Sequence, residues 1–119
     1  MTHYQNGRRF EIKVRDALQA DGYVTQLAPG SKGAADLWAG KPGQWLFISI
    51  KRTNGLISPS ERKALVDLAN HCWHPAVEVL PLVAYQPIPR KPIVFRHLTG
   101  IGPSDFALWT PDQIEGGAA

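Results

Sequence analysis

Apolar and polar positions alternate most clearly in the stretch WLFISIKR, residues 45–52. A period of two predicts a β-strand, because successive side chains of a strand point to opposite faces. Both faces of this strand are apolar until its end, where Ser49 and Lys51 interrupt one of them. We therefore expect a buried strand that ends with a serine and a lysine on the same face.

Two segments have the spacing of amphipathic helices. The first is GRRFEIKVRDALQADG, residues 7–22, which ends with Gly22 as a stop signal. The apolar face of this helix is expected to hold Phe10, Val14, Ala17 and Leu18.

The second helix is predicted in SPSERKALVDLANH, residues 58–71. Its start carries three signals: Ser58 as the N-cap, Pro59 at the first helical position, and Glu61, which completes a capping box. Its apolar face is expected to hold Ala64, Leu65, Leu68 and Cys72.

Four further segments have the composition of strands: residues 23–27, 35–40, 77–87 and 93–98. A turn through GKPGQ joins the strand at 35–40 to the strand that begins at Trp45, which predicts a hairpin. Pro81 indicates that its strand lies at an edge or carries a bulge. The predicted order is α-β-β-β-α-β-β, an α/β (α+β) fold in which helices pack on a mixed sheet of about five strands. The tail from residue 99 to 119 is expected to be irregular.

The chain has 119 residues, of which 44% are hydrophobic, and this suits one domain with a real core. No apolar stretch approaches the roughly 20 residues that cross a membrane, so we expect a soluble, cytoplasmic protein with no membrane partner. Cys72 is the sole cysteine, which excludes an internal disulfide and a cysteine metal cluster. We expect Cys72 to be a small buried apolar residue.

The net charge of +3 is unevenly distributed. Residues 1–57 hold eight Lys and Arg against four Asp and Glu, whereas residues 58–119 hold five against six. A basic excess in the half that contains the hairpin suits a polyanionic partner such as nucleic acid. The residues expected to contact phosphates as a group are Arg8, Arg9, Lys32, Lys41 and Arg52, with Lys32 in a glycine-flanked loop as the best single candidate.

Five polar residues on or before these elements are candidates for chemistry: Glu11, Ser31, Asp36, Ser49 and Lys51. Asp36 opens an apolar strand and Lys51 ends the next one, and each needs a partner when buried. Adjacent strands of a hairpin can bring the two together. Such a set suits metal-dependent phosphodiester hydrolysis, in which carboxylates hold Mg²⁺ and a lysine stabilises developing negative charge.

The order of these residues resembles the archaeal-type Holliday junction resolvases of the PD-(D/E)xK nuclease superfamily. The matching features, in chain order, are Gly7 four residues before Glu11, a basic neighbour at Arg9 or Lys13, Gly22-Tyr23-Val24 entering a strand, Ser31 in the loop, Asp36 at a short apolar strand, and Lys51 on the strand after it. The resemblance covers about residues 7–85. It implies a restriction-endonuclease-like single domain over residues 1–119, with its core at about 7–98.

The resemblance also implies a function. It predicts a Mg²⁺-dependent endonuclease, with Mn²⁺ as a substitute, that resolves four-way junctions in DNA. It predicts branched or double-stranded DNA as the partner, and a homodimer, because two opposed nicks need two active sites. Another repair or restriction-like nuclease of the superfamily is the alternative within the same class. A DNA-binding protein without catalysis is the alternative from a different class.

The chain departs from the family pattern in the stretch WLFISIKR. Where the family has Glu-x-Lys, this chain has Ser49-Ile50-Lys51, and a serine cannot supply the second carboxylate. In one reading Asp36, Glu11 and the backbone carbonyl of Ile50 hold the metal, while Ser49 bonds one of its waters. In a second reading Glu61 of the following helix supplies the carboxylate, as in some restriction endonucleases of the superfamily, although the capping box explains Glu61 as well. In the third the protein binds DNA without cutting it.

Overall fold

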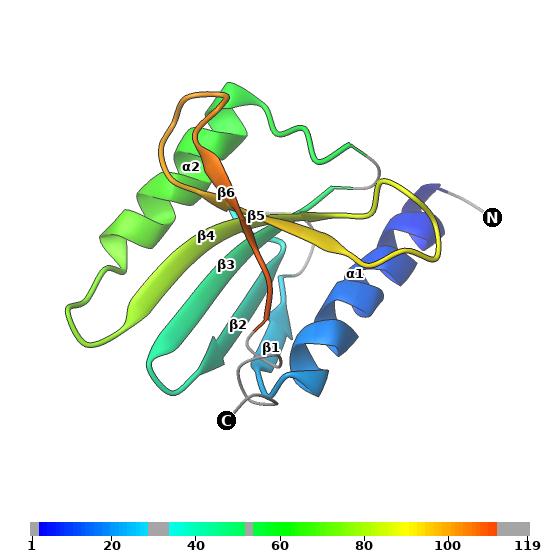
Figure 1. Cartoon of the computed structure of the whole chain (residues 1–119), viewed down its shortest axis with the longest axis horizontal. Coiled ribbons are helices and arrows are strands. Elements are labelled where there is room, and N and C mark those ends of the chain that lie inside the picture. Colours follow the sequence, from blue (N-terminus) through cyan, green and yellow to red (C-terminus); the bar gives the residue numbers. More distant parts are fainter. Residues whose placement is uncertain (1–2, 29–33, 52–53, 112–119) are drawn as a thin grey trace.

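The computed structural model describes residues 3–28, 34–51 and 54–111, and of residues 3–8 it describes the backbone only. Two helices and six strands follow one another along the chain (Figure 1). They are α1 (His3–Ala20), β1 (Val24–Leu27), β2 (Leu37–Lys41), β3 (Gln44–Ile50), α2 (Pro59–His71), β4 (Glu78–Tyr85), β5 (Val94–Leu98) and β6 (Phe106–Trp109).

The six strands form one sheet in the order β1-β2-β3-β4-β5-β6. Neighbouring strands are antiparallel except β3 and β4, which are parallel and connected through α2. The predicted mixed sheet flanked by helices is confirmed. The predicted number of strands is one too low, because residues 106–109 of the tail form β6 against β5. This strand is short and mostly exposed, so its sequence lacks the alternation that marks a half-buried strand.

The two helices cover opposite faces of the sheet (Figure 1). Leu46 and Ile48 of β3 belong to the core cluster that includes Leu18 of α1. Phe47, between them, belongs to the cluster on the other face together with Leu65 of α2. β3 is therefore buried on both faces, which explains why its sequence is apolar at nearly every position.

The hairpin of β2 and β3 forms where it was predicted. Lys41 pairs with Gln44 across a turn made by Pro42 and Gly43. Gly43 has a φ of 81°, the left-handed value required at the third position of a type II turn, where glycine is favoured. The turn fixes the register of the hairpin and thereby sets which residues of the two strands lie opposite each other.

The capping box of α2 is confirmed. Ser58 is the N-cap, its hydroxyl accepts from the backbone N–H of Glu61, and the Glu61 carboxylate accepts from the N–H of Ser58. The predicted apolar face is partly wrong, because Ala64 and Cys72 are exposed. The buried face is rotated slightly and holds Arg62, Leu65, Val66 and Ala69.

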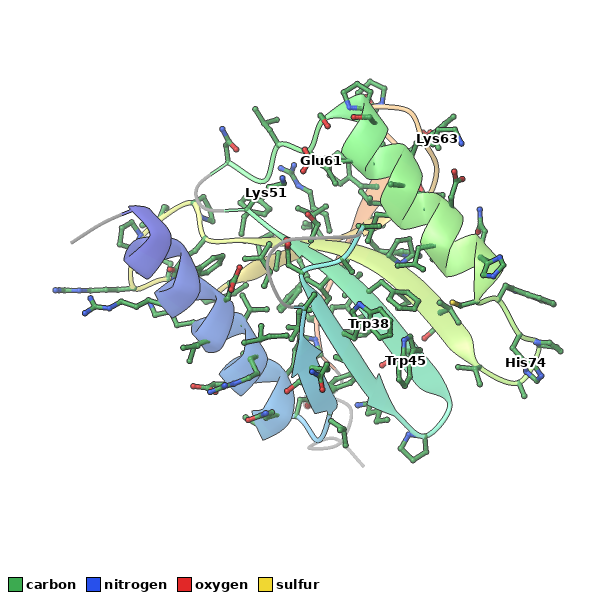
Figure 2. The ribbon with its side chains drawn as sticks, turned by 180° about the vertical axis from the view of Figure 1, so that it is seen from behind. Trp38, Trp45, Lys51, Glu61, Lys63 and His74 are labelled. Atoms are coloured by element: carbon green, nitrogen blue, oxygen red, sulfur yellow. The ribbon has the colours of Figure 1, made fainter. Side chains whose placement is uncertain are left out.

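The prediction of an edge or a bulge at Pro81 is wrong for the strand as a whole, since β4 lies between β3 and β5. However, β5 pairs with β4 only from Leu82 to Tyr85, so Pro81 lies just outside that ladder. Trp38 and Trp45 pack beside Phe47 but remain 42% and 38% exposed (Figure 2). Among the described residues, no helix combines the length and apolarity needed to span a membrane.

Candidate functional site

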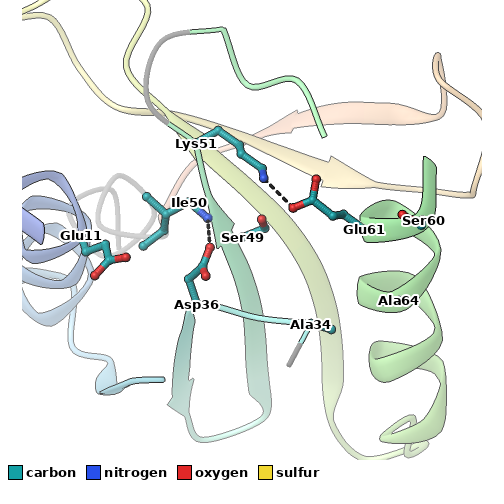
Figure 3. A pocket seen from close by; sticks show the side chains of 9 residues that line it. All are labelled: Glu11, Ala34, Asp36, Ser49, Ile50, Lys51, Ser60, Glu61 and Ala64. Carbon is teal, nitrogen blue, oxygen red and sulfur yellow. Dashed lines mark hydrogen bonds and ion pairs between the residues drawn. The ribbon is translucent and has the colours of Figure 1, made fainter. Parts of the chain in front are cut away.

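A cavity of about 600 Å³ opens where β2 begins and β3 ends (Figure 3). It lies between α1 and the first turns of α2. The residues that line it are Glu11, Ala34, Asp36, Ser49, Ile50, Lys51, Ser60, Glu61 and Ala64. The structure thus brings four of the predicted catalytic residues, Glu11, Asp36, Ser49 and Lys51, to one place, together with Glu61.

Asp36 is held against the end of β3 by two hydrogen bonds. Its backbone N–H donates to the carbonyl of Ile48 at 2.8 Å, and its Oδ2 accepts from the N–H of Ile50 at 2.7 Å. The hairpin register positions these groups, since Leu37 is paired with Ile48. Its other oxygen, Oδ1, accepts no hydrogen bond from the described residues, so that oxygen is available to a ligand.

Lys51 is fixed by its backbone and by its side chain. Its N–H donates to the carbonyl of Ala84 in β4 at 2.9 Å, which extends the parallel pairing one residue beyond β3. Its Nζ donates to Oε2 of Glu61 at 2.7 Å, and the two side chains are 24% and 51% exposed. The ammonium therefore lies at the rim of the cavity, turned toward the start of α2 (Figure 3).

Glu61 has two roles in this arrangement. Oε1 accepts from the N–H of Ser58 at 3.2 Å as part of the capping box, while Oε2 accepts from Lys51. The hydrogen bond from Lys51, followed by the one from the Ser58 backbone, holds the pKa of Glu61 below its ordinary value of 4.5, although burial acts in the opposite direction. Glu61 therefore completes the capping box and also lines the cavity, so its role as a cap does not remove it from the site.

Ser49 is buried, with 4% of its surface exposed, and it lines the cavity from the middle of the sheet. It is paired with Val83 of β4, so its position is fixed by the central parallel ladder. Glu11 enters from the other side, on α1, across the cavity from Glu61 (Figure 3). It follows Phe10, which packs in the core, so the helix places Glu11 at the border of its buried face.

The residues of the cavity fit a hard cation better than a soft one. Its lining, in the part of the chain that the structure describes, has carboxylate oxygens and no imidazole or thiol. Over residues 3–28, 34–51 and 54–111, no three His, Cys, Asp or Glu side chains lie close enough to hold a metal together. Mg²⁺ still suits such a sparse site, because it keeps several waters and binds through one or two carboxylates.

Of the five predicted DNA contacts, the structure describes the side chains of only two, Arg9 and Lys41. Arg9 is exposed on α1. Ser31, Lys32, Arg52 and the side chain of Arg8 lie outside the described residues. Lys41 lies at the opposite end of β2 from Asp36, with its Nζ 3.5 Å from Oδ2 of Asp21 and above the ring of Tyr23. The structure therefore does not bring Lys41 to the cavity.

Sequence reasoning missed three lining residues, Ala34, Ser60 and Ala64. The helical spacing contained part of the signal, because Ala64 follows Glu61 by three residues and must share its face. The apolar spacing of the helix instead predicts Ala64 on its buried face, because a small apolar residue fits either position.

No protein-family model matches this chain, and no curated protein matches it. Among solved structures, the chain is similar to Hjc of Archaeoglobus fulgidus, a Holliday junction resolvase from an archaeal hyperthermophile. The two share 27% sequence identity with a TM-score of 0.61, and the match covers 76% of this chain and 70% of Hjc. This similarity supports the resemblance to archaeal resolvases, which rested on the order of residues in the sequence.

Proposed function

We propose that this protein is a Mg²⁺-dependent endonuclease that cleaves branched DNA, with four-way junctions as the preferred substrate and with Mn²⁺ able to replace Mg²⁺. One observation carries the proposal: Asp36 and Lys51 meet at one cavity with Glu61 and Glu11, on a fold similar to that of a Holliday junction resolvase. A homodimer follows from the substrate, because two opposed strands of a junction require two active sites.

Asp36 and Glu61 are the residues that we expect to hold the metal, with the carbonyl of Ile50 as a further oxygen donor. Glu11 is not close enough to complete a group of three carboxylates with them, so it would contact the metal through one of the waters that Mg²⁺ keeps. When bound there, Mg²⁺ would polarise the scissile phosphate and lower the pKa of a water. Asp36 is suited to this role because Ile50 already orients its carboxylate. Each carboxylate oxygen of Glu61 accepts one hydrogen bond, from Ser58 or from Lys51, and keeps a second lone pair, so a metal would share or compete for this carboxylate with Lys51.

Lys51 then acts on the phosphate. Release from Glu61 leaves its ammonium beside the cavity, where it can stabilise the negative charge that develops on the phosphate oxygens. Ser49 contributes a hydroxyl in place of the carboxylate that the family pattern has at this position. The site is thus one negative charge short unless Glu61 supplies it, and this makes Glu61 the residue on which the metal affinity depends.

Asp36→Asn tests the proposal. We expect cleavage of a labelled four-way junction in Mg²⁺ to fall by about a hundredfold or more, because several kcal/mol of charge stabilisation are lost with the metal. Junction binding measured in Ca²⁺ or without metal should persist, since the shape of the side chain is kept. Asp67→Asn is the matched control, because Asp67 is exposed on α2 and pairs with Lys63. Cleavage by Asp36→Asn at the wild-type rate would show that the site is wrong.

A second candidate, DNA binding without catalysis, is favoured by Ser49 and by the ion pair that occupies Lys51. The same assay separates the two functions. A wild-type protein that binds the junction tightly but does not cut it at any concentration of Mg²⁺ or Mn²⁺ is a binding protein.

A further inference from the structure

A second cavity, of about 200 Å³, lies on the other side of the first turn of α2. Its lining comes from the segment before α2, from the first turn of α2, from β5 and from the loop that precedes β6. Arg62, Arg96, Leu56 and Ile101 are among the residues that line it. Two arginines and no acidic residue line it among the described residues, so its charge is positive.

Arg96 of β5 is held in place by aromatic rings rather than by hydrogen bonds. Its guanidinium carbon lies 4.6 Å from the ring centre of Tyr85 and 4.6 Å from that of Phe106. These rings, from the strands on either side, clamp the guanidinium plane. Its Nε is buried and has no hydrogen-bond partner among the described residues. A buried donor without a partner is costly, so native proteins rarely keep one without a reason.

Arg62 of α2 is 7% exposed, which is unusual for an arginine. One of its terminal nitrogens donates to the backbone carbonyl of Asp105 at 3.3 Å. Within the described part of the chain, neither Arg62 nor Arg96 forms an ion pair with a carboxylate. Arg62 is buried and Arg96 is partly buried, and charges in such positions are normally paired, so these two cations lack the anion that proteins usually supply.

We propose that Arg62 and Arg96 form an anion site that binds a phosphoryl group. Guanidinium forks match the geometry of phosphate oxygens, and a phosphoryl group offers enough oxygens to accept from both arginines. The cavity is smaller than the roughly 300–1,000 Å³ of pockets that enclose whole small-molecule ligands, so it suits one phosphoryl group rather than an entire nucleotide. Leu56 and Ile101, both largely exposed, offer apolar surface for the group that carries the phosphate.

The phosphoryl group can belong to DNA or to a free phosphate. The DNA source rests on the proposed function: Arg62 directly follows Glu61, so a strand that enters the first cavity has a phosphate-binding pocket next to it, across the first turn of α2. The free-phosphate source requires no nuclease activity. The experiment therefore has one arm for each source.

The first arm measures thermal unfolding in chloride and in inorganic phosphate at constant ionic strength. We expect phosphate at ten times its dissociation constant to raise the wild-type Tm by about 5 °C. Arg96→Met and Arg62→Met should lose this rise. Lys63→Met is the matched control, since Lys63 is exposed on the outer side of α2 and pairs with Asp67 (Figure 2); it should keep the full rise.

The same arm excludes a purely structural role for Arg96. Methionine keeps the apolar stem between the two rings and removes the unpartnered donor, so Arg96→Met should melt in chloride no lower than wild type. A variant that melts lower in chloride but keeps the phosphate shift would overturn the proposal. Arg96→Lys, which keeps the charge but not the fork, should lose most of the phosphate shift and serves as the second variant if methionine prevents folding.

The second arm measures the affinity for a four-way junction as a function of salt. If the phosphate belongs to DNA, each arginine variant should bind more weakly, with a salt slope smaller by about 0.9 per lost phosphate contact. Loss of the phosphate shift with unchanged DNA binding assigns the site to free phosphate. A wild-type Tm indifferent to phosphate, with unchanged DNA binding by both variants, refutes the site. Wild-type protein that neither binds nor cuts DNA refutes the proposed function instead and leaves the phosphate arm standing.

Discussion

Glu61→Gln tests whether Glu61 holds the metal or acts only as the cap of α2 and the ion-pair partner of Lys51. Glutamine also completes a capping box, so the hydrogen bond to the N–H of Ser58 can be kept while the charge beside Lys51 is lost. The Glu61 side chain is 51% exposed and its charge is screened by solvent, so the ion pair is worth about 0.2–1 kcal/mol. We therefore expect the Tm to fall by about 4 °C at most.

The pH dependence of this loss has a defined sign. The hydrogen bond from Lys51 lowers the pKa of Glu61 in the folded protein, so the carboxylate stabilises the fold at pH values above its ordinary pKa of 4.5. That contribution disappears as the pH falls through the lowered pKa. The difference in unfolding free energy between wild type and Glu61→Gln should thus be constant near pH 7 and vanish in strong acid, as measured by urea unfolding at several pH values.

The effect on the metal should be much larger than the effect on stability. If Glu61 supplies the carboxylate that Ser49 lacks, the Mg²⁺ concentration for half-maximal junction cleavage should rise by about 10- to 100-fold. Ser58→Ala is the matched control, because it removes the hydroxyl that caps α2 and leaves the Glu61 charge in place. It should cost about 1 kcal/mol of stability and leave the Mg²⁺ dependence unchanged. An unchanged Mg²⁺ requirement in Glu61→Gln would refute the reasoning and leave Glu61 as a cap and ion-pair partner.

Two further predictions concern charge at other positions. Ser49→Glu restores the family pattern and should lower the Mg²⁺ concentration needed for cleavage; a higher requirement would mean that repulsion from Glu61 raises the pKa of a carboxylate in the cavity. Burial lowers the pKa of His97, and the charge of Glu78 partly opposes this effect. As the pH falls through 6.5, the unfolded chain therefore binds a proton at His97 more readily than the folded chain does. Stability should therefore fall between pH 7 and 5.5, in a range where Glu61 stays ionised, and His97→Gln should flatten this fall in urea unfolding.

Several elements were predictable from the sequence because their signals are local. The hairpin of β2 and β3 follows from alternation on both sides of a Pro-Gly turn, and the start of α2 follows from Ser58, Pro59 and Glu61. The sixth strand was not predictable in this way. Residues 106–108 are exposed and Trp109 is only partly buried, and these residues form a strand because β5 offers a free edge for backbone pairing. The exposure of Cys72 likewise depends on how α2 is rotated against the sheet.

The sequence by itself determined which residue types were available for chemistry: an acid before one strand, and a serine and a lysine at the end of the next. It left the role of Glu61 open, because a capping box and a place in the cavity require the same residue at the same position. Only the tertiary structure shows that the capping residue Glu61 also lines the cavity, since the crossover from β3 to β4 brings the first turn of α2 beside Lys51. The sequence could not show that Arg62 and Arg96 line one cavity, for the same reason. The two arginines are 34 positions apart, one on a helix and one on a strand. A local sequence pattern cannot predict a cavity that forms where such distant segments meet.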